Sequence, residues 1–322
     1  MPWSRSALVT SIGGETMGTT WSVKLVSPPD LDLRDVERRL EARLAVVVAQ
    51  MSTWDAGSDI SRFNRAEPGS LHVLAPEFFT VLRYALSVAN ETAGAYDPTA
   101  GALVDLWGFG PGGPRREAPD DVAIAAARAA TGWQRVMVDV ASRTIRQPGG
   151  IRIDLSSVAK GFAVDQLAEG LMGLGVVDCL AEIGGELRGE GTKPDGSPWL
   201  VGLEQPRGTI APSLPETLIA LHRLAVATSG DAQRAFESGG RRFSHTLDPR
   251  SGCPVPERLA SVSVLHPRAM CADALATALT VLGADAGFAH ACWHDLAARF
   301  VLRGAGGLEE RTTPAFAAML ES

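Results

Sequence analysis

The sequence predicts an α+β fold in which helices pack against mixed β-sheets. Apolar residues recur every three or four positions over residues 31–51 and 76–93, as on one face of a helix. Over residues 19–26 apolar and polar residues alternate instead, as in a strand that buries one face. The two patterns follow each other in an irregular order, which favours α+β over the regular alternation of a doubly wound sheet.

The elements expected along the chain follow from these patterns. In the first half we expect a strand at 19–26, helices at 31–51, 76–93 and 120–131, loops at 51–66 and 95–114, and a strand pair at 136–155 turning at the Pro-Gly-Gly of 148–150. In the second half we expect a helix at 156–175, strands at 179–191, 199–206, 221–230, 241–249 and 259–266, and an apolar helix over 272–279. The polar, proline-rich residues 206–217 predict an exposed loop.

Length and composition exclude several classes of protein. A chain of 322 residues with 45% hydrophobic and 21% charged residues can bury one large core or two smaller ones. It has 30 basic and 37 acidic residues, a net charge of −7, so electrostatics give no reason to expect nucleic acid as a partner. No run of about 20 apolar residues predicts a membrane span.

The first 25 residues lack the apolar core and cleavage site of a signal peptide. We therefore expect this form of the chain to be cytoplasmic, or periplasmic if it is the trimmed form of a longer precursor. The four cysteines are far apart and form no Cys-x-x-Cys pair, so we expect free thiols. His290 and His294 lie one helical turn apart, but no third ligand follows at motif spacing, which favours surface histidines over a metal site.

A polar cluster stands where the predicted strand at 151–155 meets the next helix. Asp154, Ser156, Ser157 and Lys160 lie there, and the first turn of a helix offers unpaired N–H groups that suit a phosphate. An ordinary helix cap by Asp154 or Ser156, with a solvated lysine, explains the same residues. Both interpretations stay open from this segment alone.

Three other segments carry weaker signals of the same kind. "EIGGE" (182–186) ends a strand in two glycines, which permit a hairpin turn or a close approach to a ligand. "ATSGD" (227–231) suits an anion site or a helix cap. His245, in "SHTLDP" (244–249), precedes a tight turn, where it is either structural or a general base.

The helix "ADALATAL" (272–279) places Asp273 and Thr277 four residues apart, so both project from one face. One interpretation is a helix start, with Asp273 near the N-cap and Thr277 bonded back to the helix. The other is a hard-cation site, since Mg²⁺ prefers carboxylate, hydroxyl, carbonyl and phosphate oxygens. Together with Lys160 and His245, this pair is the inventory of an enzyme that acts on a nucleotide or pyrophosphate.

The sequence resembles the ApbE-like FAD:protein FMN transferases. The resemblance is collinear over residues 15–285 and is carried by the following motifs: "ETMGTTWSV" (15–23), "MSTWDAGSDISRFN" (51–64), "AYDPTAGALVDLWGFGP" (95–111), "IDLSSVAKGFAVD" (153–165), "EIGGELRGEGTKPDGSPWLVGLEQP" (182–206), "AVATSGD" (225–231), "RRFSHTLDPRSGCPV" (241–255) and "ADALATAL" (272–279). It implies an N-terminal extension over 1–14 and a single domain over 15–322, in one or two lobes, with a T-fold-related architecture and a flavin cleft between lobes.

The resemblance also implies an activity. Such enzymes bind FAD with Mg²⁺ on its pyrophosphate, transfer FMN to a threonine hydroxyl of an acceptor flavoprotein, and release AMP. An FAD pyrophosphatase, in which water replaces the threonine, would use the same site. A non-catalytic FAD carrier is the third possibility, which the joint presence of the metal pair and the histidine argues against.

Site residues are implied position by position. The implied metal ligands are Asp273 and Thr277, with the backbone carbonyls of Ser157 and Ala276, and the implied catalytic residue is His245. The implied FAD contacts are Met17, Trp54, Ala95, Tyr96, Asp97, Asp154, Lys160 and Leu247. Trp54 stands where the family more often has tyrosine, which keeps an aromatic face but removes a hydroxyl.

Overall fold

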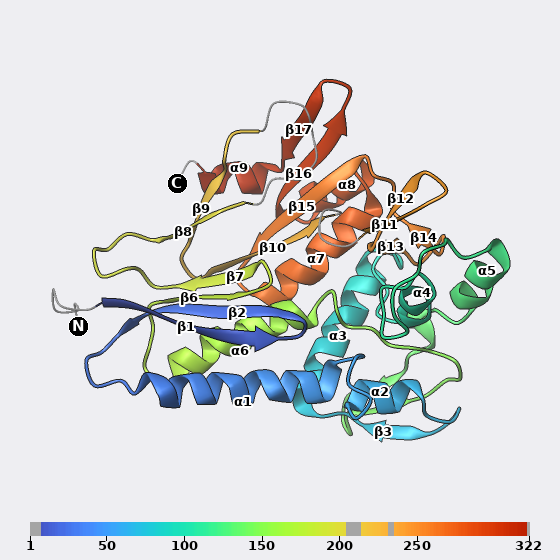
Figure 1. The fold of residues 1–322 in the computed structure, drawn as a ribbon, viewed down its shortest axis with the longest axis horizontal. Coiled ribbons are helices and arrows are strands. Elements are labelled where there is room, and N and C mark those ends of the chain that lie inside the picture. The colour runs from blue at the N-terminus through green and yellow to red at the C-terminus, as the bar shows by residue number, and fades with distance from the viewer. Residues whose placement is uncertain (1–7, 204–213, 231–234, 321–322) are drawn as a thin grey trace.

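The computed structural model describes residues 8–203, 214–230 and 235–320 (Figure 1). Within these residues the α+β prediction is confirmed: helices cover one face of a large antiparallel sheet. Most of the predicted loop at 206–217, the end of the predicted strand at 199–206 and Asp231 of the "ATSGD" segment lie outside the described residues. The described helices include none that is long and apolar enough to cross a membrane.

The main sheet has eight strands in the order β1-β2-β6-β7-β10-β15-β16-β17. Their bounds are β1 Leu8–Thr16, β2 Thr19–Ser27, β6 Cys179–Ile183, β7 Glu186–Glu190, β10 Leu224–Gly230, β15 Leu259–His266, β16 Ala297–Gly304 and β17 Gly307–Thr312. The expected 14/15 domain boundary falls inside β1, which pairs with β2 along its whole length.

Every ladder of this sheet is antiparallel, so the expectation of mixed sheets was wrong. For three of the seven ladders the reason lies in the connections: two residues join β1 to β2, β6 to β7 and β16 to β17, and so short a link can only reverse the chain. Among the residues that the structure describes, the one parallel pairing is an isolated bridge between Ala100 and Arg152.

Two layers cover the sheet (Figure 1). On one face lie α1 (Leu33–Met51), α3 (Pro76–Glu91), α6 (Ala159–Gly173), α7 (Ala269–Leu282) and α8 (Ala286–Trp293). On the other lie the hairpin of β8 (Trp199–Gly202) and β9 (Leu218–Leu221) and the helix α9 (Pro314–Leu320). Neighbouring residues of one strand therefore enter different cores: Leu25 of β2 packs under the helices and Val26 under the hairpin.

Smaller elements surround the end of this helix layer. They are α2 (Asp59–Asn64), β3 (Leu71–Val73), α4 (Gly101–Leu106), α5 (Asp121–Ala129), the 3₁₀ turn Trp133–Arg135, β4 (Val138–Asp139), β5 (Thr144–Arg146), β11 (Ala235–Ser238), β12 (Arg241–Ser244), β13 (Leu247–Asp248) and β14 (Cys253–Pro254). The helices predicted at 31–51, 76–93, 120–131 and 156–175 correspond to α1, α3, α5 and α6.

Two predicted loops contain short helices. The segment 51–66 holds α2, whose N-cap is Ser58; the Ser58 hydroxyl accepts the Ser61 N–H at 3.2 Å. The segment 95–114 holds α4. Six residues make less than two turns, too few for a helical repeat to stand out, so tertiary packing decides these helices.

Several predicted strands are interrupted. The segment 179–191 is the β6–β7 hairpin, which turns at Gly184 and Gly185, with φ of 57° and 103°. The segment 221–230 breaks after Leu221, and 241–249 breaks at His245 and Thr246. In 136–155 the hairpin of β4 and β5 turns at residues 140–143, and the Pro-Gly-Gly stretch follows it.

Candidate functional site

The candidate site forms where α6 and α7 meet. A Cβ atom on Gly161 would lie 2.3 Å from the Ala269 carbonyl oxygen, so only glycine permits this approach of the two helices. The Gly161 N–H, in the first turn of α6, donates to Oδ2 of Asp273 at 3.0 Å. The start of α6, just after the segment from Asp154 to Lys160, is therefore in direct contact with the predicted metal-binding helix. The two hydrogen-bonded residues, Gly161 and Asp273, are 112 residues apart in the chain.

Asp165 fixes the start of α7. Its Oδ1 accepts the Ala269 N–H at 2.9 Å and its Oδ2 accepts the Met270 N–H at 3.0 Å. The side chain at the α7 N-cap, Arg268, makes no capping hydrogen bond, so a carboxylate from α6 caps α7. Because Asp165 also accepts from Arg188 at 2.7 Å, α6, α7 and β7 are joined at a single buried residue.

Asp273 lies inside α7, four residues after its first residue, and is 6% exposed. The interpretation of Asp273 as an N-cap residue was therefore wrong. Burial raises the pKa of this carboxyl, while the nearby Lys160 ammonium and the Gly161 N–H act in the opposite direction. The back-bonding hydroxyl of the helix belongs to Thr280, which donates to the Ala276 carbonyl at 2.8 Å.

Lys160 and Glu186 form a partly buried ion pair, with Nζ 2.6 Å from Oε1. Glu186 is 4% exposed, and its other oxygen, Oε2, is buried without a hydrogen-bond partner in the described structure. Burial raises the pKa of Glu186 to about 7; the charge of Asp273 adds to this effect and the Lys160 ammonium opposes it. Lys160 thus lies between two buried carboxylates that compete for one positive charge.

Strand β7 turns a row of charges toward α6. Glu186, Arg188 and Glu190 recur at every second position and so share one face of the strand. Arg188 pairs with Asp165 at 2.7 Å and with Glu190 at 2.7 Å. Sequence reasoning noted Glu186 only as the flank of a glycine turn; the alternation of charge over 186–190 was the signal that could have identified this face.

The segment from Ala95 to Gly101 lies beside the start of α6. The Asp154 N–H donates to the Pro98 carbonyl at 2.8 Å, and the Ser157 hydroxyl donates to the Tyr96 hydroxyl at 3.2 Å. Tyr96 is buried, and burial, together with the charge of Asp273, raises the pKa of its hydroxyl, which therefore stays protonated. The predicted Tyr96, Ser157 and Asp273 are thus close neighbours.

Asp97 and Asp154 each close a local turn. Asp97 Oδ1 accepts the Thr99 N–H at 2.8 Å, and Asp154 Oδ1 accepts the Ser156 N–H at 2.8 Å. Desolvation raises the pKa of both carboxyls against these hydrogen bonds. Neither Asp154 nor Ser156 caps α6, because that helix begins at Ala159 with Val158 at its cap position, so the capping interpretation was wrong.

Met17 and Trp54 lie in the turns that follow β1 and α1. Met17 has φ of 50° and Gly18 has φ of 73°, the left-handed pair of a two-residue hairpin turn. A methionine in this conformation costs about 1–2 kcal/mol relative to a glycine. Met17 packs against the main core, whereas Trp54 is 61% exposed and offers an open aromatic face.

His245 and Leu247 lie near an aromatic cluster at the end of the helix layer. The His245 and Phe109 rings form a T-shaped pair with centroids 6.2 Å apart, and Leu247 packs with Leu103 and Trp107. The following turn reaches α7, because the Arg250 guanidinium donates to the Val281 carbonyl at 3.4 Å. Ala95 joins the same region by packing with Val255 and Val281.

The predicted metal ligands form a set of oxygen donors. Asp273 and Thr277 lie one turn apart on α7, and Ser157 lies just before α6. Such a set of oxygen donors fits a hard cation such as Mg²⁺. Burial disfavours the negative charge of Asp273, and a bound cation would compensate that charge. The Ala276 carbonyl is the weakest member, because it already accepts from Thr280. Among the described residues, His, Cys, Asp and Glu form no metal-holding cluster of three, so the carbonyl and hydroxyl donors matter.

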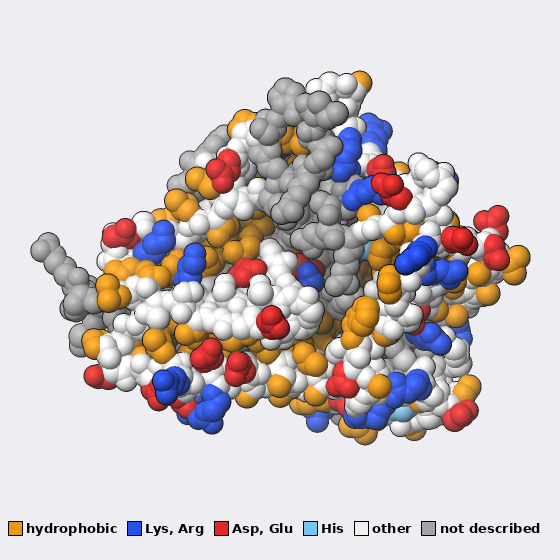
Figure 2. All heavy atoms as spheres, in the orientation of Figure 1, with side chains coloured by type: hydrophobic (Ala, Val, Ile, Leu, Met, Phe, Trp, Pro, Cys, Tyr) orange, Lys and Arg blue, Asp and Glu red, His pale blue; other side chains and the backbone are white. Residues whose placement is uncertain are grey.

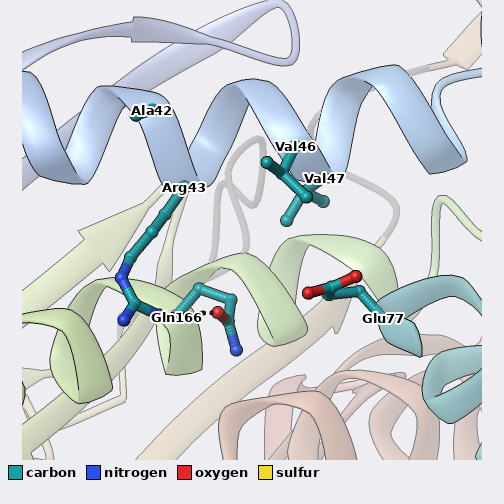
Figure 3. A pocket seen from close by; sticks show the side chains of 6 residues that line it. All are labelled: Ala42, Arg43, Val46, Val47, Glu77 and Gln166. Carbon is teal, nitrogen blue, oxygen red and sulfur yellow. Dashed lines mark hydrogen bonds between the residues drawn. The ribbon is translucent and has the colours of Figure 1, made fainter. Parts of the chain in front are cut away.

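A surface pocket of about 380 Å³ lies elsewhere, on the side of α6 that faces α1 (Figure 3). Its lining residues come from α1, α3 and α6: Ala42, Arg43, Val46, Val47, Glu77 and Gln166. Arg43 donates to Gln166 across it at 3.0 Å. It contains none of the predicted site residues and no arrangement of groups for phosphate chemistry, so it is not the candidate site.

The chain matches the model of the ApbE family over residues 17–300. It is 36% identical over 323 residues to a Haemophilus influenzae protein named FAD:protein FMN transferase, covering 98% of this chain and 92% of that protein. A Vibrio cholerae protein of the same name is 35% identical over 308 residues, covering 95% of this chain and 91% of the relative.

The fold is similar to solved structures of the same kind. The apo form of the Pseudomonas stutzeri flavinyl transferase ApbE superposes with a TM-score of 0.90 at 38% identity, covering 98% of each chain. The flavin transferase ApbE from Vibrio cholerae superposes with a TM-score of 0.88 at 33% identity, covering 97% of this chain and 99% of that one.

Proposed function

The chain belongs to the ApbE family of FAD:protein FMN transferases, and from this premise we propose that it transfers FMN from FAD to a threonine hydroxyl of an acceptor protein. We propose further that the reaction depends on Mg²⁺ and releases AMP. The observation that carries the proposal is the junction of α6 and α7. There a buried carboxylate, Asp273, and the Lys160 ammonium meet at the start of a helix.

The proposed transfer reaction requires that the negative charge of the FAD diphosphate be neutralised. A threonine hydroxyl is a weak nucleophile, and the diphosphate of FAD repels an attacking anion. Mg²⁺, held by Asp273 and Thr277 with the carbonyls of Ser157 and Ala276, would neutralise phosphate charge. Lys160 would bind a phosphate oxygen and keep the diphosphate in line with the attacking hydroxyl.

His245 would assist the nucleophile. Its ring lies just after β12, near Phe109, and α7 is connected to the same segment through Arg250. In the proposed reaction it takes the proton of the threonine hydroxyl as the oxygen attacks phosphorus, and AMP leaves with the electron pair of the broken P–O bond.

The remaining predicted residues would bind FAD. We propose that the FAD contacts are Met17, Trp54, Ala95, Tyr96, Asp97, Asp154, Lys160 and Leu247. Trp54 supports this assignment because its exposed ring can stack on a planar aromatic group. Tyr96 supports it because its hydroxyl stays neutral and can remain near phosphate without repulsion.

The test is a transfer assay. The protein is incubated with FAD, Mg²⁺ and a candidate acceptor domain, and the acceptor is examined by mass spectrometry for a covalently bound FMN. An adduct that disappears when the acceptor threonine is replaced by alanine supports the proposal. FMN and AMP without an adduct would indicate an FAD pyrophosphatase, and unaltered FAD bound to the protein would indicate a carrier.

A further inference from the structure

Glu186 is not among the proposed metal-binding, catalytic or FAD-binding residues, but it forms an ion pair with one of them, Lys160. It belongs to β7, on the row of charges that faces α6, and it holds the Lys160 ammonium at 2.6 Å. The side chain of Lys160 is 30% exposed and that of Glu186 only 6% exposed. The ammonium of a partly exposed lysine is thus held by a carboxylate that is more deeply buried than the lysine side chain.

We propose that Glu186 is a positioning residue for the transfer reaction, holding the Lys160 ammonium where it meets the diphosphate of FAD. The inference rests on the proposed function, because it concerns the same lysine. Glu186 itself touches neither substrate nor the reacting atoms in this proposal; it acts through Lys160.

Competition between two carboxylates supports this role. The charge of Lys160 acts on both Glu186 and Asp273, but the hydrogen bond of 2.6 Å goes to Glu186. A lysine without such an anchor has four rotatable bonds and would be drawn toward Asp273, the carboxylate assigned to the cation. By holding the ammonium, Glu186 keeps lysine and cation from competing for one carboxylate.

The unfavourable burial of the Glu186 carboxylate also supports a role in positioning Lys160. Its Oε2 is buried without a donor in the described structure, which is unfavourable for an oxygen that serves the fold alone. Arg188 and Glu190, on the same face of β7, satisfy each other and Asp165. Glu186 is the member of this row that is directed to the lysine of the candidate site instead.

Positioning and simple charge make opposite predictions for turnover, whereas neither predicts weaker FAD binding. If Glu186 acted only through its negative charge, its removal would relieve repulsion of the anionic diphosphate and improve both binding and turnover. If it positions Lys160, its removal lets FAD bind at least as tightly while kcat falls. A split between affinity and kcat therefore identifies positioning.

The experiment uses the full chain with FAD, Mg²⁺ and acceptor, and compares E186A, E186Q, K160A and the double variant K160A/E186A. FAD affinity is measured by quenching of flavin fluorescence, kcat by formation of the flavinylated acceptor, and folding by thermal denaturation. E182Q is the matched control, because Glu182 lies in the same hairpin but accepts from Ser22 at 3.1 Å and from the Gly185 N–H at 3.0 Å.

We expect E186A to lower kcat by about 10- to 100-fold, the range for loss of one charge-assisted hydrogen bond, without weakening FAD binding. E186Q, which keeps an acceptor oxygen for Lys160, should retain more activity than E186A, and E182Q should retain wild-type activity. In the K160A background, E186A should have little further effect, because the two residues act as one unit.

Two results would overturn the inference: effects of E186A and K160A that multiply in the double variant, or an E186A enzyme with unchanged kcat. If E186A fails to fold, E186Q in the same cycle decides between these outcomes. Failure of the proposed function is a separate result, because the wild-type protein would then form no flavinylated acceptor at all.

Discussion

At the scale of single residues, Glu186 is a buried carboxyl group whose surroundings disfavour its ionised form. Burial and the nearby Asp273 raise its pKa from 4.5 to about 7, and Lys160 on α6 only partly offsets them. The folded protein therefore holds this proton more tightly than the unfolded chain does. Its contribution to stability is fully present below pH 4.5 and is lost as pH rises through about 7.

The variant E186Q removes this titration and keeps the hydrogen-bond acceptor. From pH 4.5 to pH 8 the free energy of unfolding of the wild type should fall relative to that of E186Q, by up to about 3 kcal/mol. Lys160 and Asp273 are present in both proteins, so the difference reports the titration of Glu186 together with its interaction with Asp273. Urea unfolding at a series of pH values measures it, and a difference that is flat or that grows with pH would contradict the assignment.

The variant D273N tests the proposed cation ligand. It removes one negative charge from a buried site, so the protein should fold while Mg²⁺-stimulated turnover falls by about 100-fold or more. Turnover as a function of Mg²⁺ concentration is the measurement. D195N is the control, because Asp195 is an exposed turn residue that accepts from the Ser197 N–H. An unchanged Mg²⁺ response in D273N would remove Asp273 from the site.

Sequence reasoning proposed the side chains with an obvious chemical role and missed the residues that contact them or their helices. Asp273 and Lys160 were identified from local motifs and a family resemblance. Gly161, Asp165 and Glu186 were not, because their function depends on partners 112, 104 and 26 residues away. A local pattern carries no record of such a contact, except where charges alternate along a strand, as they do over 186–190.

At the scale of elements, the close approach of α6 and α7 depends on a missing side chain. The variant G161A places a Cβ atom 2.3 Å from the Ala269 carbonyl oxygen, so the helices must separate. We expect the free energy of unfolding to fall by about 1–3 kcal/mol, as in overpacked cores. The hydrogen bond from the Gly161 N–H to Asp273 should weaken as well, and Mg²⁺ affinity with it.

Gly173, at the other end of the same helix, provides the control. A Cβ atom there would meet nothing within 4 Å, so G173A should be neutral or should stabilise the protein by up to about 1 kcal/mol. Urea unfolding of both variants gives the comparison. Equal stability of G161A and G173A would mean that the helices are not in contact as described.

Element boundaries were predictable only where the sequence repeats long enough. The 19 residues of α1 show a clear helical period, whereas the six of α2 and the six of α4 do not. The segment 179–191 was expected as a strand, with a hairpin turn at its two glycines left open, and it is the β6–β7 hairpin. Pairing between strands, and not the pattern within them, decides such turns.

At the scale of the whole molecule, the fold class followed from the periodicity and the order of the sequence patterns, but the strand order could not be predicted from them. The sheet places β2 beside β6. Trp21 of β2 pairs with Ile183 of β6, and these two residues are far apart in the chain. Which strands pair depends on how much apolar surface the whole sheet buries on both of its faces. The sequence of a single segment contains no information about this total. Figure 2 shows acidic and basic side chains interspersed along the lower edge of the face in view.

Ligand binding should stabilise the molecule as a unit. FAD at 100 times its dissociation constant adds about 2.7 kcal/mol to the free energy of unfolding, which should raise the melting temperature by several degrees. Mg²⁺ should add a further increment in the wild type. In D273N we expect the FAD increment to remain and the Mg²⁺ increment to disappear, measured by thermal denaturation; equal increments in both proteins would place the cation elsewhere.

The capping of α7 by Asp165 has a consequence for synthesis of the chain. The carboxylate and the amide that it accepts are 104 residues apart. At about 5–20 residues per second, a ribosome needs roughly 5–20 s to make the intervening chain. During that interval the chain contains the sequence of α6 but not the amides of α7 that Asp165 accepts. The junction of α6 and α7, which holds the proposed site, therefore cannot form until α7 has been translated.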